Sequence, residues 1–358
     1  MLNFNDSLLL SKNKSFGCYR SERYKLLYVA TPKVACTSLK WWFASLEGYE
    51  QILREISDSS QPGPDLIIHD NLPKVAPNIA ALTPEMVFEA LTSDEYFRFA
   101  VVRNPYKRIF SAWQSKLLLR ESVHIAPYLK SDFLYYPLEG PEDIAKAFEA
   151  FLEHLFLSEA PSYRDVHWTP QANLLRPHLI HYSKLVQIEN PEELSQALME
   201  RIGGKVPDPF SGQHSNQSLI PYLPEMVSAR SAELIRLLYA LDFETFGYSM
   251  EPPEGKETFS SGQFKVVIKA IAFIRGRHQR FGECNVKIGN LQQAIAERDL
   301  KINSHALELS RLYRSKSWRI TGPARFLRRS LAGNFIIPCV LLFRASLRRL
   351  YAFFGHLT

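Results

Sequence analysis

Cysteine is scarce in this chain, with four residues in 358. Cys18, Cys36, Cys284 and Cys339 form no Cys-x-x-Cys pair and have no metal-ligand spacing. Their spacing therefore argues against a disulfide framework and against structural zinc. We expect a reducing compartment, in which each thiol serves in packing.

Long apolar runs are also missing. The run Phe335–Phe343 spans nine residues and contains Pro338, so it is too short to cross a bilayer. The segment Met1–Ser15 has no basic region before its short apolar run and no small-residue cleavage site. It predicts neither a signal peptide nor a signal anchor, and we expect the catalytic part to stay in the cytoplasm.

Acidic residues are absent from Leu309 to Thr358, where ten Arg and Lys residues occur. These ten exceed the net charge of +6, so the rest of the chain is net acidic and nucleic-acid binding is not indicated. The segment 313–358, with Trp318 and Phe326, predicts a basic amphipathic tail at an anionic membrane surface. The alternative is that this tail packs on a partner helix or on the body of the protein.

What the sequence does contain is a repeated strand-to-helix pattern. Tyr24–Ala30, Phe97–Val102 and Lys184–Glu189 are predicted as buried strands of a parallel sheet. The first two run directly into helical patterns, the second with Asn104 as N-cap and Pro105 as first helical residue. The pattern predicts an α/β fold with a central parallel sheet flanked by helices.

Composition divides the chain into four parts. We expect a catalytic domain over 1–250, a Pro- and Gly-containing linker over 251–263, a helical segment over 264–312 and the basic tail over 313–358. The helical segment has apolar residues at a seven-residue period, at Ile288, Leu291, Ile295, Ile302, Leu309 and Leu312. Arg298 and His305 occupy the two remaining core positions, so a short or imperfect coiled coil is expected.

The loop "TPKVACTS", Thr31 to Ser38, lies between the first predicted strand and its helix. Such a loop directs backbone N–H groups and the positive end of the helix dipole at one point, which favours a phosphate- or sulfate-like anion. A nucleotide triphosphate loop needs GxxxxGK[ST], but here Lys33 comes four residues before Thr37 and no glycine precedes it. We therefore expect a different anion, held without a metal.

The second junction, "VVRNPYKRIFSAW", places Arg103 at a strand end and Ser111 about two turns into the following helix. An arginine fork and a hydroxyl at these positions suit a second phosphate. The alternative is a structural ion pair for Arg103 and a small exposed position for Ser111.

Together the two junctions resemble the 5′-phosphosulfate and 3′-phosphate motifs of the Golgi-type carbohydrate sulfotransferases, which include the chondroitin and dermatan 4-O-sulfotransferases. Two further stretches, beginning at His167 ("HWTPQANLL") and Leu237 ("LLYALDFETFGY"), are similar to that family in the same order. The resemblance implies a fold related to nucleotide kinases. It also implies 3′-phosphoadenosine 5′-phosphosulfate (PAPS) as donor and a glycan or glycolipid hydroxyl as acceptor.

The resemblance assigns a role to each donor-site residue. Lys33 would contact the 5′-phosphosulfate and stabilise the charge on the leaving oxygen, and Arg103 and Ser111 would bind the 3′-phosphate. The 5′-phosphate would be held by the loop and first helical turn, at Val34, Ala35, Cys36, Thr37 and Ser38.

The acceptor hydroxyl must also lose a proton, which requires a general base. His69, in "DLIIHDNLPK", is the first candidate, because related enzymes have a histidine after a second strand-like segment at this place. His167 is the alternative base, although the adjacent Trp168 and the "TPQ" turn also suit a residue that orders the acceptor. For His69 itself, the competing interpretation is a strand-end histidine with a structural hydrogen bond.

One departure from the animal enzymes concerns cysteine. Leu175 and His178 replace the two cysteines that follow the "HW" block there, which implies a bacterial cytosolic enzyme. The tail further resembles a terminal segment of bacterial polysaccharide-assembly enzymes, which suggests contact with such enzymes or with the inner face of the membrane. The competing functions are an ATP-dependent kinase on a related fold and an inactive scaffold in polysaccharide assembly.

Overall fold

The fold is built on a four-stranded sheet with the order β1-β2-β3-β4. This computed structural model describes residues 17–56, 63–158, 165–204, 207–210, 218–255 and 260–331. β1 (Cys18–Ser21) pairs antiparallel with β2 (Leu26–Val29), whereas β2, β3 (Phe97–Val102) and β4 (Lys184–Gln187) run parallel. The three predicted strands and the mixed α/β class are confirmed, and β1 is an addition that the sequence did not indicate.

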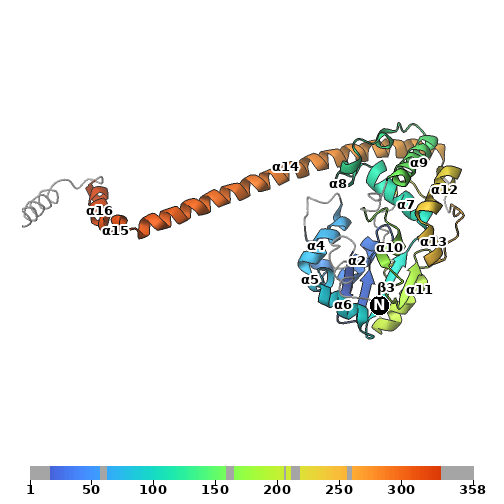
Figure 1. The fold of residues 1–358 in the computed structure, drawn as a ribbon, viewed down its shortest axis with the longest axis horizontal. Helices are drawn as coiled ribbons and strands as arrows, with labels where there is room; N and C mark the ends of the chain where they lie inside the picture. Colours follow the sequence, from blue (N-terminus) through green and yellow to red (C-terminus); the bar gives the residue numbers. More distant parts are fainter. Residues whose placement is uncertain are drawn as a thin grey trace, which may run out of the picture. The chain divides into compact units, whose positions relative to one another are not determined.

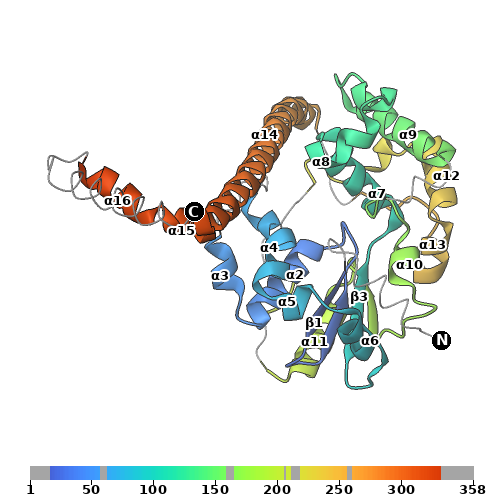
Figure 2. The ribbon, with the colours of Figure 1, turned by 60° about the vertical axis from the view of Figure 1, so that its left-hand side comes forward.

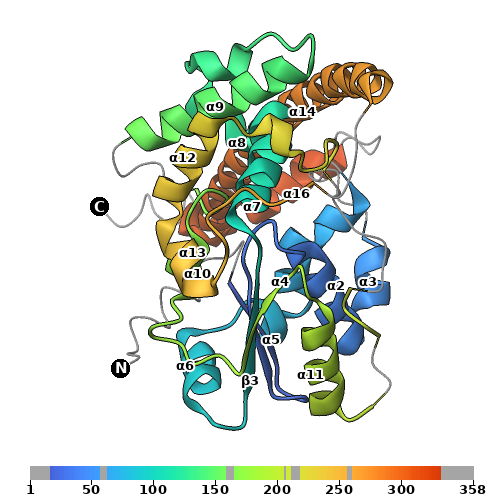
Figure 3. The same ribbon diagram turned by 90° about the vertical axis from the view of Figure 1, so that its right-hand side faces the viewer.

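The strands are buried on both faces, as is typical of a parallel sheet covered by helices. On one face, Tyr28 and Phe99 pack with α2 (Cys36–Leu46), α4 (Ile68–Val75), α5 (Pro77–Ala80) and α11 (Glu192–Ile202). On the other face, Val29 and Ala100 pack with α6 (Pro84–Thr92) and α10 (Gln171–Leu175). The sheet is thus the middle of three layers (Figure 3).

A second, helical core adjoins this sandwich (Figures 1 and 2). It is formed by α7 (Pro105–Trp113), α9 (Pro141–Leu157), α12 (Ala229–Leu238), α13 (Ala240–Phe246) and the start of α14 (Ser261–Arg314). Phe110 of α7 meets Phe148 of α9 edge to face, with ring centroids 5.2 Å apart. Because α7 follows directly from β3, this core fixes the helix that carries Ser111.

Short helical segments complete this part of the chain. They are α3 (Glu50–Arg54), η1 (Pro64–Ile67), the π-helical η2 (Gln114–Leu118), α8 (Ser122–Ile125), η3 (Ala126–Tyr128), η4 (Asp132–Tyr135) and η6 (Pro224–Met226).

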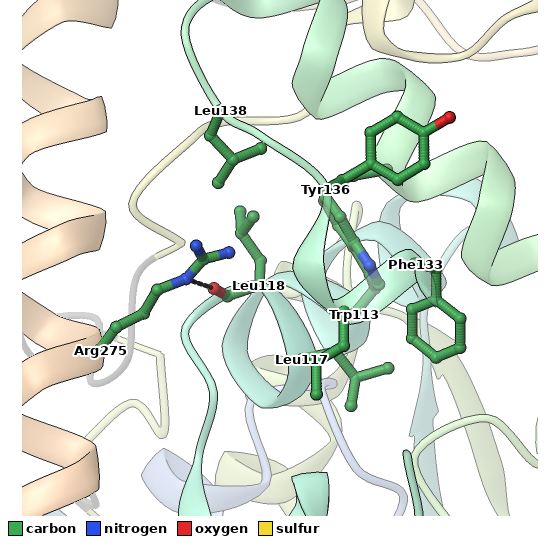
Figure 4. A pocket seen from close by; sticks show the side chains of 9 residues that line it. Trp113, Leu117, Leu118, Phe133, Tyr136, Leu138 and Arg275 are labelled. Carbon is green, nitrogen blue, oxygen red and sulfur yellow. Dashed lines mark hydrogen bonds between the residues drawn. The ribbon is translucent and has the colours of Figure 1, made fainter. Parts of the chain in front are cut away.

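The first part of α14 packs on the π-helix η2. Phe264, Val267 and Ile271 are buried, and Arg275 Nε donates a 2.8 Å hydrogen bond to the Leu118 carbonyl beside a small apolar pocket (Figure 4). The first compact unit accordingly extends to Asn285 and the second comprises Val286–Thr358. The predicted catalytic domain over 1–250 and linker over 251–263 stay a prediction. α14 begins at Ser261, and its apolar start packs in the helical core.

One local expectation was wrong. The segment around His69 is not a strand end: η1 leads into α4, and His69 lies in the first turn of that helix. Further along the chain, α12 ends at Leu238 and α13 begins at Ala240.

The basic tail continues as α15 (Lys316–Ile320) and α16 (Gly322–Leu331). The guanidinium of Arg325 stacks on the Trp318 ring, 3.6 Å from its centroid. The runs Met1–Ser15 and Phe335–Phe343 lie outside the described residues. Within the described ranges, every helix is too short or too polar to traverse a bilayer.

Candidate functional site

The loop between β2 and α2 adopts a conformation that glycine usually provides. Lys33 has φ 67° and Ala35 has φ 50°, both in the left-handed region. Each such non-glycine residue costs about 1–2 kcal/mol. Left-handed residues at alternate positions turn successive N–H groups toward one side and form an anion-binding concavity. The loop therefore has the shape of a phosphate loop although its sequence lacks the glycines.

The start of α2 adds further donors to this concavity. Ala35 is the N-cap and has no side chain that caps the helix, and the α2 dipole places positive charge there. Val34 is fully buried and anchors the loop in the core, and Thr37 lies in the first turn. Thr31 Oγ1 donates a 2.8 Å hydrogen bond to the Val101 carbonyl, which ties the loop to β3.

Lys33 and Arg103 meet at this loop. Arg103 Nη1 donates a 3.2 Å hydrogen bond to the Lys33 carbonyl, so the end of β3 contacts the loop after β2. Burial, followed by the positive charge of Lys116, lowers the pKa of Lys33 to about 7. Burial also lowers the pKa of Arg103, while Glu189 opposes this shift. A bound anion would offset the repulsion among these cations.

Ser111 is buried on α7 and accepts a 3.1 Å hydrogen bond from Ser218 Oγ. The alternative interpretation, in which Ser111 is a small exposed residue, is therefore wrong. Arg103 and Ser111 come from β3 and the helix that follows it, but a joint phosphate clamp between them stays a prediction.

The two later sequence blocks meet at Arg103 through a buried network. Gln171 Oε1 accepts from the Arg103 backbone N–H, and Gln171 Nε2 donates to the Arg103 carbonyl, each at 2.9 Å. Asp242 accepts from the N–H groups of Gln171 and Ala172 at 2.9 and 2.8 Å. Gln171 belongs to the "HWTPQ" block and Asp242 to the "LDFETFGY" block, so these blocks hold the end of β3 in place.

Arg108 forms a second network of hydrogen bonds, and its role was not predicted from the sequence. Its side chain is 1% exposed and donates to the carbonyls of Pro32, Val166 and Thr169 at 3.1, 3.1 and 2.8 Å. One guanidinium thus joins the phosphate loop, α7 and the "HW" block. No sequence signal separates this arginine from Lys107 beside it, which is why its role was not predicted.

His69 contacts α2 from α4. Its Nδ1 lies 2.7 Å from Lys40 Nζ, and its Nε2 lies 3.2 Å from Thr37 Oγ1. Burial, followed by the charge of Lys40, holds the pKa of His69 well below its usual value. An ammonium group only donates hydrogen bonds, so Lys40 stabilises the tautomer of His69 whose proton is on Nε2. In this arrangement Nε2 donates to Thr37.

In His167 the ring proton lies on the other nitrogen, Nδ1. Its Nδ1 lies 2.6 Å from Asp165 Oδ1, which also accepts the His167 backbone N–H at 2.9 Å. A carboxylate only accepts, so the Nδ1 proton points to Asp165 and the lone pair of the neutral ring is on Nε2. Burial lowers the pKa of His167 to about 3, while Asp165 opposes this shift.

His124 lies beside this pair, with ring centroids of His124 and His167 4.7 Å apart and His124 Nδ1 3.4 Å from Asp165 Oδ2. One ligand atom from each of the three side chains falls within 4.8 Å of the others, so the group has the composition of a metal site. Asp165 holds the two histidines together, because each of them has its Nδ1 within hydrogen-bond distance of one of its carboxylate oxygens.

Lys116 is a further cation that the sequence did not reveal. It lies in the π-helix η2, and its Nζ pairs with Glu121 Oε2 at 2.6 Å. Its charge affects the pKa of Lys33, of His69 and of His167, so it belongs to the same site. A π-helical turn shifts every later residue around the helix axis, and sequence periodicity does not reveal such a turn.

Comparison with known proteins gives a family match and several similar proteins, and all of them are sulfotransferases. Residues 17–249 match the sulfotransferase family. The chain is 25% identical over 251 residues to carbohydrate sulfotransferase 10 of Xenopus laevis, covering 64% of this chain and 66% of the relative. It is 28% identical over 243 residues to human carbohydrate sulfotransferase 14, covering 64% and 59%. It is 24% identical over 246 residues to human carbohydrate sulfotransferase 9, covering 64% and 53%.

These alignments span less than two thirds of the relatives' own lengths. Among solved structures, none matches the chain at a significant level.

Proposed function

The chain belongs to the sulfotransferase family, and we propose that it transfers a sulfuryl group from PAPS to a hydroxyl of a carbohydrate. The observation that carries this proposal is the meeting of Lys33 and Arg103 at a left-handed loop before α2. Cations and backbone N–H groups converge there, as the donor's phosphate and sulfate groups require.

The residues present suit PAPS. The N–H groups from Val34 to Ser38, with the hydroxyls of Thr37 and Ser38, would hold the 5′-phosphate, and Arg103 and Ser111 would hold the 3′-phosphate. PAPS supplies the activated sulfuryl group. Lys33 would stabilise the negative charge that develops on the leaving phosphate oxygen, and Lys116 adds positive charge to the same region.

The acceptor hydroxyl attacks sulfur, the bond between sulfur and the bridging oxygen breaks, and the hydroxyl proton passes to a base. The sequence-based choice of His69 for this base stays a prediction. The hydrogen bonds favour His167 instead, because its Nε2 carries the lone pair while Nε2 of His69 carries a proton. In that assignment His69 keeps Thr37 in place and Asp165 orients His167.

The acceptor and the location of the enzyme are further parts of the proposal. The names of the relatives support a carbohydrate acceptor, such as a cell-surface polysaccharide, oligosaccharide or glycolipid. A bacterial cytoplasmic enzyme is proposed from Leu175 and His178 at the cysteine positions of the animal enzymes. Its attachment to the inner face of the membrane, or to polysaccharide-assembly enzymes, is proposed from the basic tail. The exposed Trp318 and Phe326 beside Arg325 support the membrane version.

Flotation of the full chain with anionic vesicles tests this tail. We expect binding that is lost when Trp318 and Phe326 are both replaced by Ser, and no binding to neutral vesicles. Equal flotation of the variant would remove the membrane proposal while leaving the enzymatic one intact.

Retention on immobilised adenosine 3′,5′-bisphosphate tests the donor assignment. Elution by free bisphosphate and not by ATP supports PAPS. Equal elution by ATP would favour the kinase alternative, and absence of retention would favour the inactive scaffold.

A further inference from the structure

The second half of α14 carries an apolar stripe on an exposed helix. The six stripe residues are 40–64% exposed: Ile288, Leu291, Ile295, Ile302, Leu309 and Leu312. The first half of the same helix buries Phe264, Val267 and Ile271. A polar helix has no need of a regular apolar stripe, so the contrast between the halves points to a partner for the second half.

The spacing of the stripe defines the geometry of that partner. Assigned to heptads, Ile288, Ile295 and Ile302 occupy successive a positions, and Leu291 and Leu312 occupy d positions. Isoleucine at a with leucine at d favours two parallel strands. The stripe from Ile288 to Leu312 extends for about 37 Å along the helix at 1.5 Å per residue.

The polar core positions indicate that the partner is a second copy. Arg298 lies at a d position, where it packs against the e position of the facing strand in a parallel, in-register pair. The e position here is Asp299, so each strand offers the charge that the other lacks. The other polar d residue, His305, has its own ion-pair partner in Glu308, 3.6 Å away on the same helix.

We propose that residues 288–312 of α14 form a parallel, in-register, two-stranded coiled coil with a second copy of this chain. The seam is defined by the six stripe residues with Arg298 and His305. Arg298 of one strand and Asp299 of the other fix the register, because a shift of one strand by a heptad separates the two charges.

The helix also provides matched controls. Leu300 and Leu307 are 70% and 64% exposed and lie at f positions, outside the seam. They match the seam residues in hydrophobicity and exposure but face away from the proposed partner.

Light scattering on the full chain tests the proposal. The wild type is expected at twice the chain mass of 41.2 kDa. The double variant Ile295→Asp, Ile302→Asp is expected at the mass of one chain, while Leu300→Asp, Leu307→Asp stays at twice that mass. A monomeric wild type, a larger oligomer, or dissociation by the control variant would overturn the proposal.

Oxidative cross-linking tests the orientation. Cys284 is exposed and lies one heptad before Leu291, at a d position. In a background of Cys339→Ser, oxidation is expected to link two chains, and the further change Cys284→Ser is expected to abolish the link. A dimer that fails to cross-link would contradict the parallel register. Neither result depends on activity or on binding of adenosine 3′,5′-bisphosphate, so failure here is distinct from failure of the proposed function.

Discussion

Arg103 Nη1 contacts the carbonyl of Lys33 at 3.2 Å, although 70 positions separate the two residues in the chain. This bond joins the two strand-to-helix junctions, which are separate motifs in the sequence. It places a guanidinium and an ammonium group at one loop, and their repulsion lowers the pKa of Lys33 further after burial and Lys116 have done so. The site is therefore prepared for an anion.

Lys33→Ala is expected to lower turnover more than donor binding. Removal of one group that stabilises developing charge typically costs about 10²–10³ in kcat. Steady-state kinetics with PAPS, combined with titration of adenosine 3′,5′-bisphosphate, separates the two effects. A loss confined to donor affinity would show that Lys33 binds the ground state only.

The pH dependence should show an alkaline limb. The pKa of Lys33 is lowered to about 7, so its positive charge is lost as the pH rises above that value. We expect kcat/KM for PAPS, which reports the free enzyme, to fall through this range. Lys33→Arg should move the limb to higher pH, because a guanidinium stays charged. An unchanged limb in that variant would assign it to another group.

Arg103→Ala is expected to weaken binding of PAPS by about 10- to 100-fold, since a hydrogen bond to a charged group contributes about 1.5–3 kcal/mol. Adenosine 5′-phosphosulfate, which lacks the 3′-phosphate, should lose little affinity. Ser111→Ala should have the same selectivity with a smaller effect. Equal losses of affinity for both ligands would mean that Arg103 contacts the 5′ groups of the donor, or that it only stabilises the fold.

The two histidines can be distinguished by rescue. If His167 is the base, His167→Gly should lose turnover, keep donor binding and recover activity with added imidazole. Asp165→Asn should lower kcat, because it replaces a carboxylate that only accepts hydrogen bonds with an amide that can also donate, so the tautomer of His167 is no longer fixed. Loss of turnover and imidazole rescue in His69→Gly, with a nearly normal His167→Gly, would restore the sequence-based choice.

Arg108→Met is expected to destabilise the fold by about 3 kcal/mol or more, since it leaves three carbonyls, two of them in buried hydrogen bonds, without their charged donor. Urea unfolding measures the change, with Lys146→Met on the exposed side of α9 as control. Unchanged stability would mean that water replaces the guanidinium at these carbonyls.

The sequence predicted the local parts of this site because they depend on neighbouring residues. β3 has the predicted bounds, and Asn104 Oδ1 accepts from the Tyr106 N–H as an N-cap should. The "DLIIHDNLPK" segment was misread because three consecutive apolar residues, Leu66 to Ile68, fit a strand as well as a helix. Pro64, at the start of η1, was the available signal for a helical beginning.

Other features depend on tertiary contacts that one sequence does not reveal. Lys40 and His69 approach each other only because α4 packs on α2, and the tautomer of His69 follows from that contact. Lys116 reaches the site through a π-helical turn, and Arg108 through two converging segments, the loop at Pro32 and the stretch that holds Val166 and Thr169. The left-handed conformations of Lys33 and Ala35 were not predicted, because non-glycine residues rarely adopt them. The loop was recognised instead from its place between a strand and a helix.

Transfer of radiolabelled sulfate from PAPS is the most direct test of the account. The purified chain is incubated with labelled PAPS and cell-surface glycan extracts in the presence of EDTA, with Lys33→Ala as control. We expect label in carbohydrate, released by glycan-degrading enzymes, with a large loss in the variant. Absence of labelled carbohydrate, together with transfer of the γ-phosphate from labelled ATP, would contradict it.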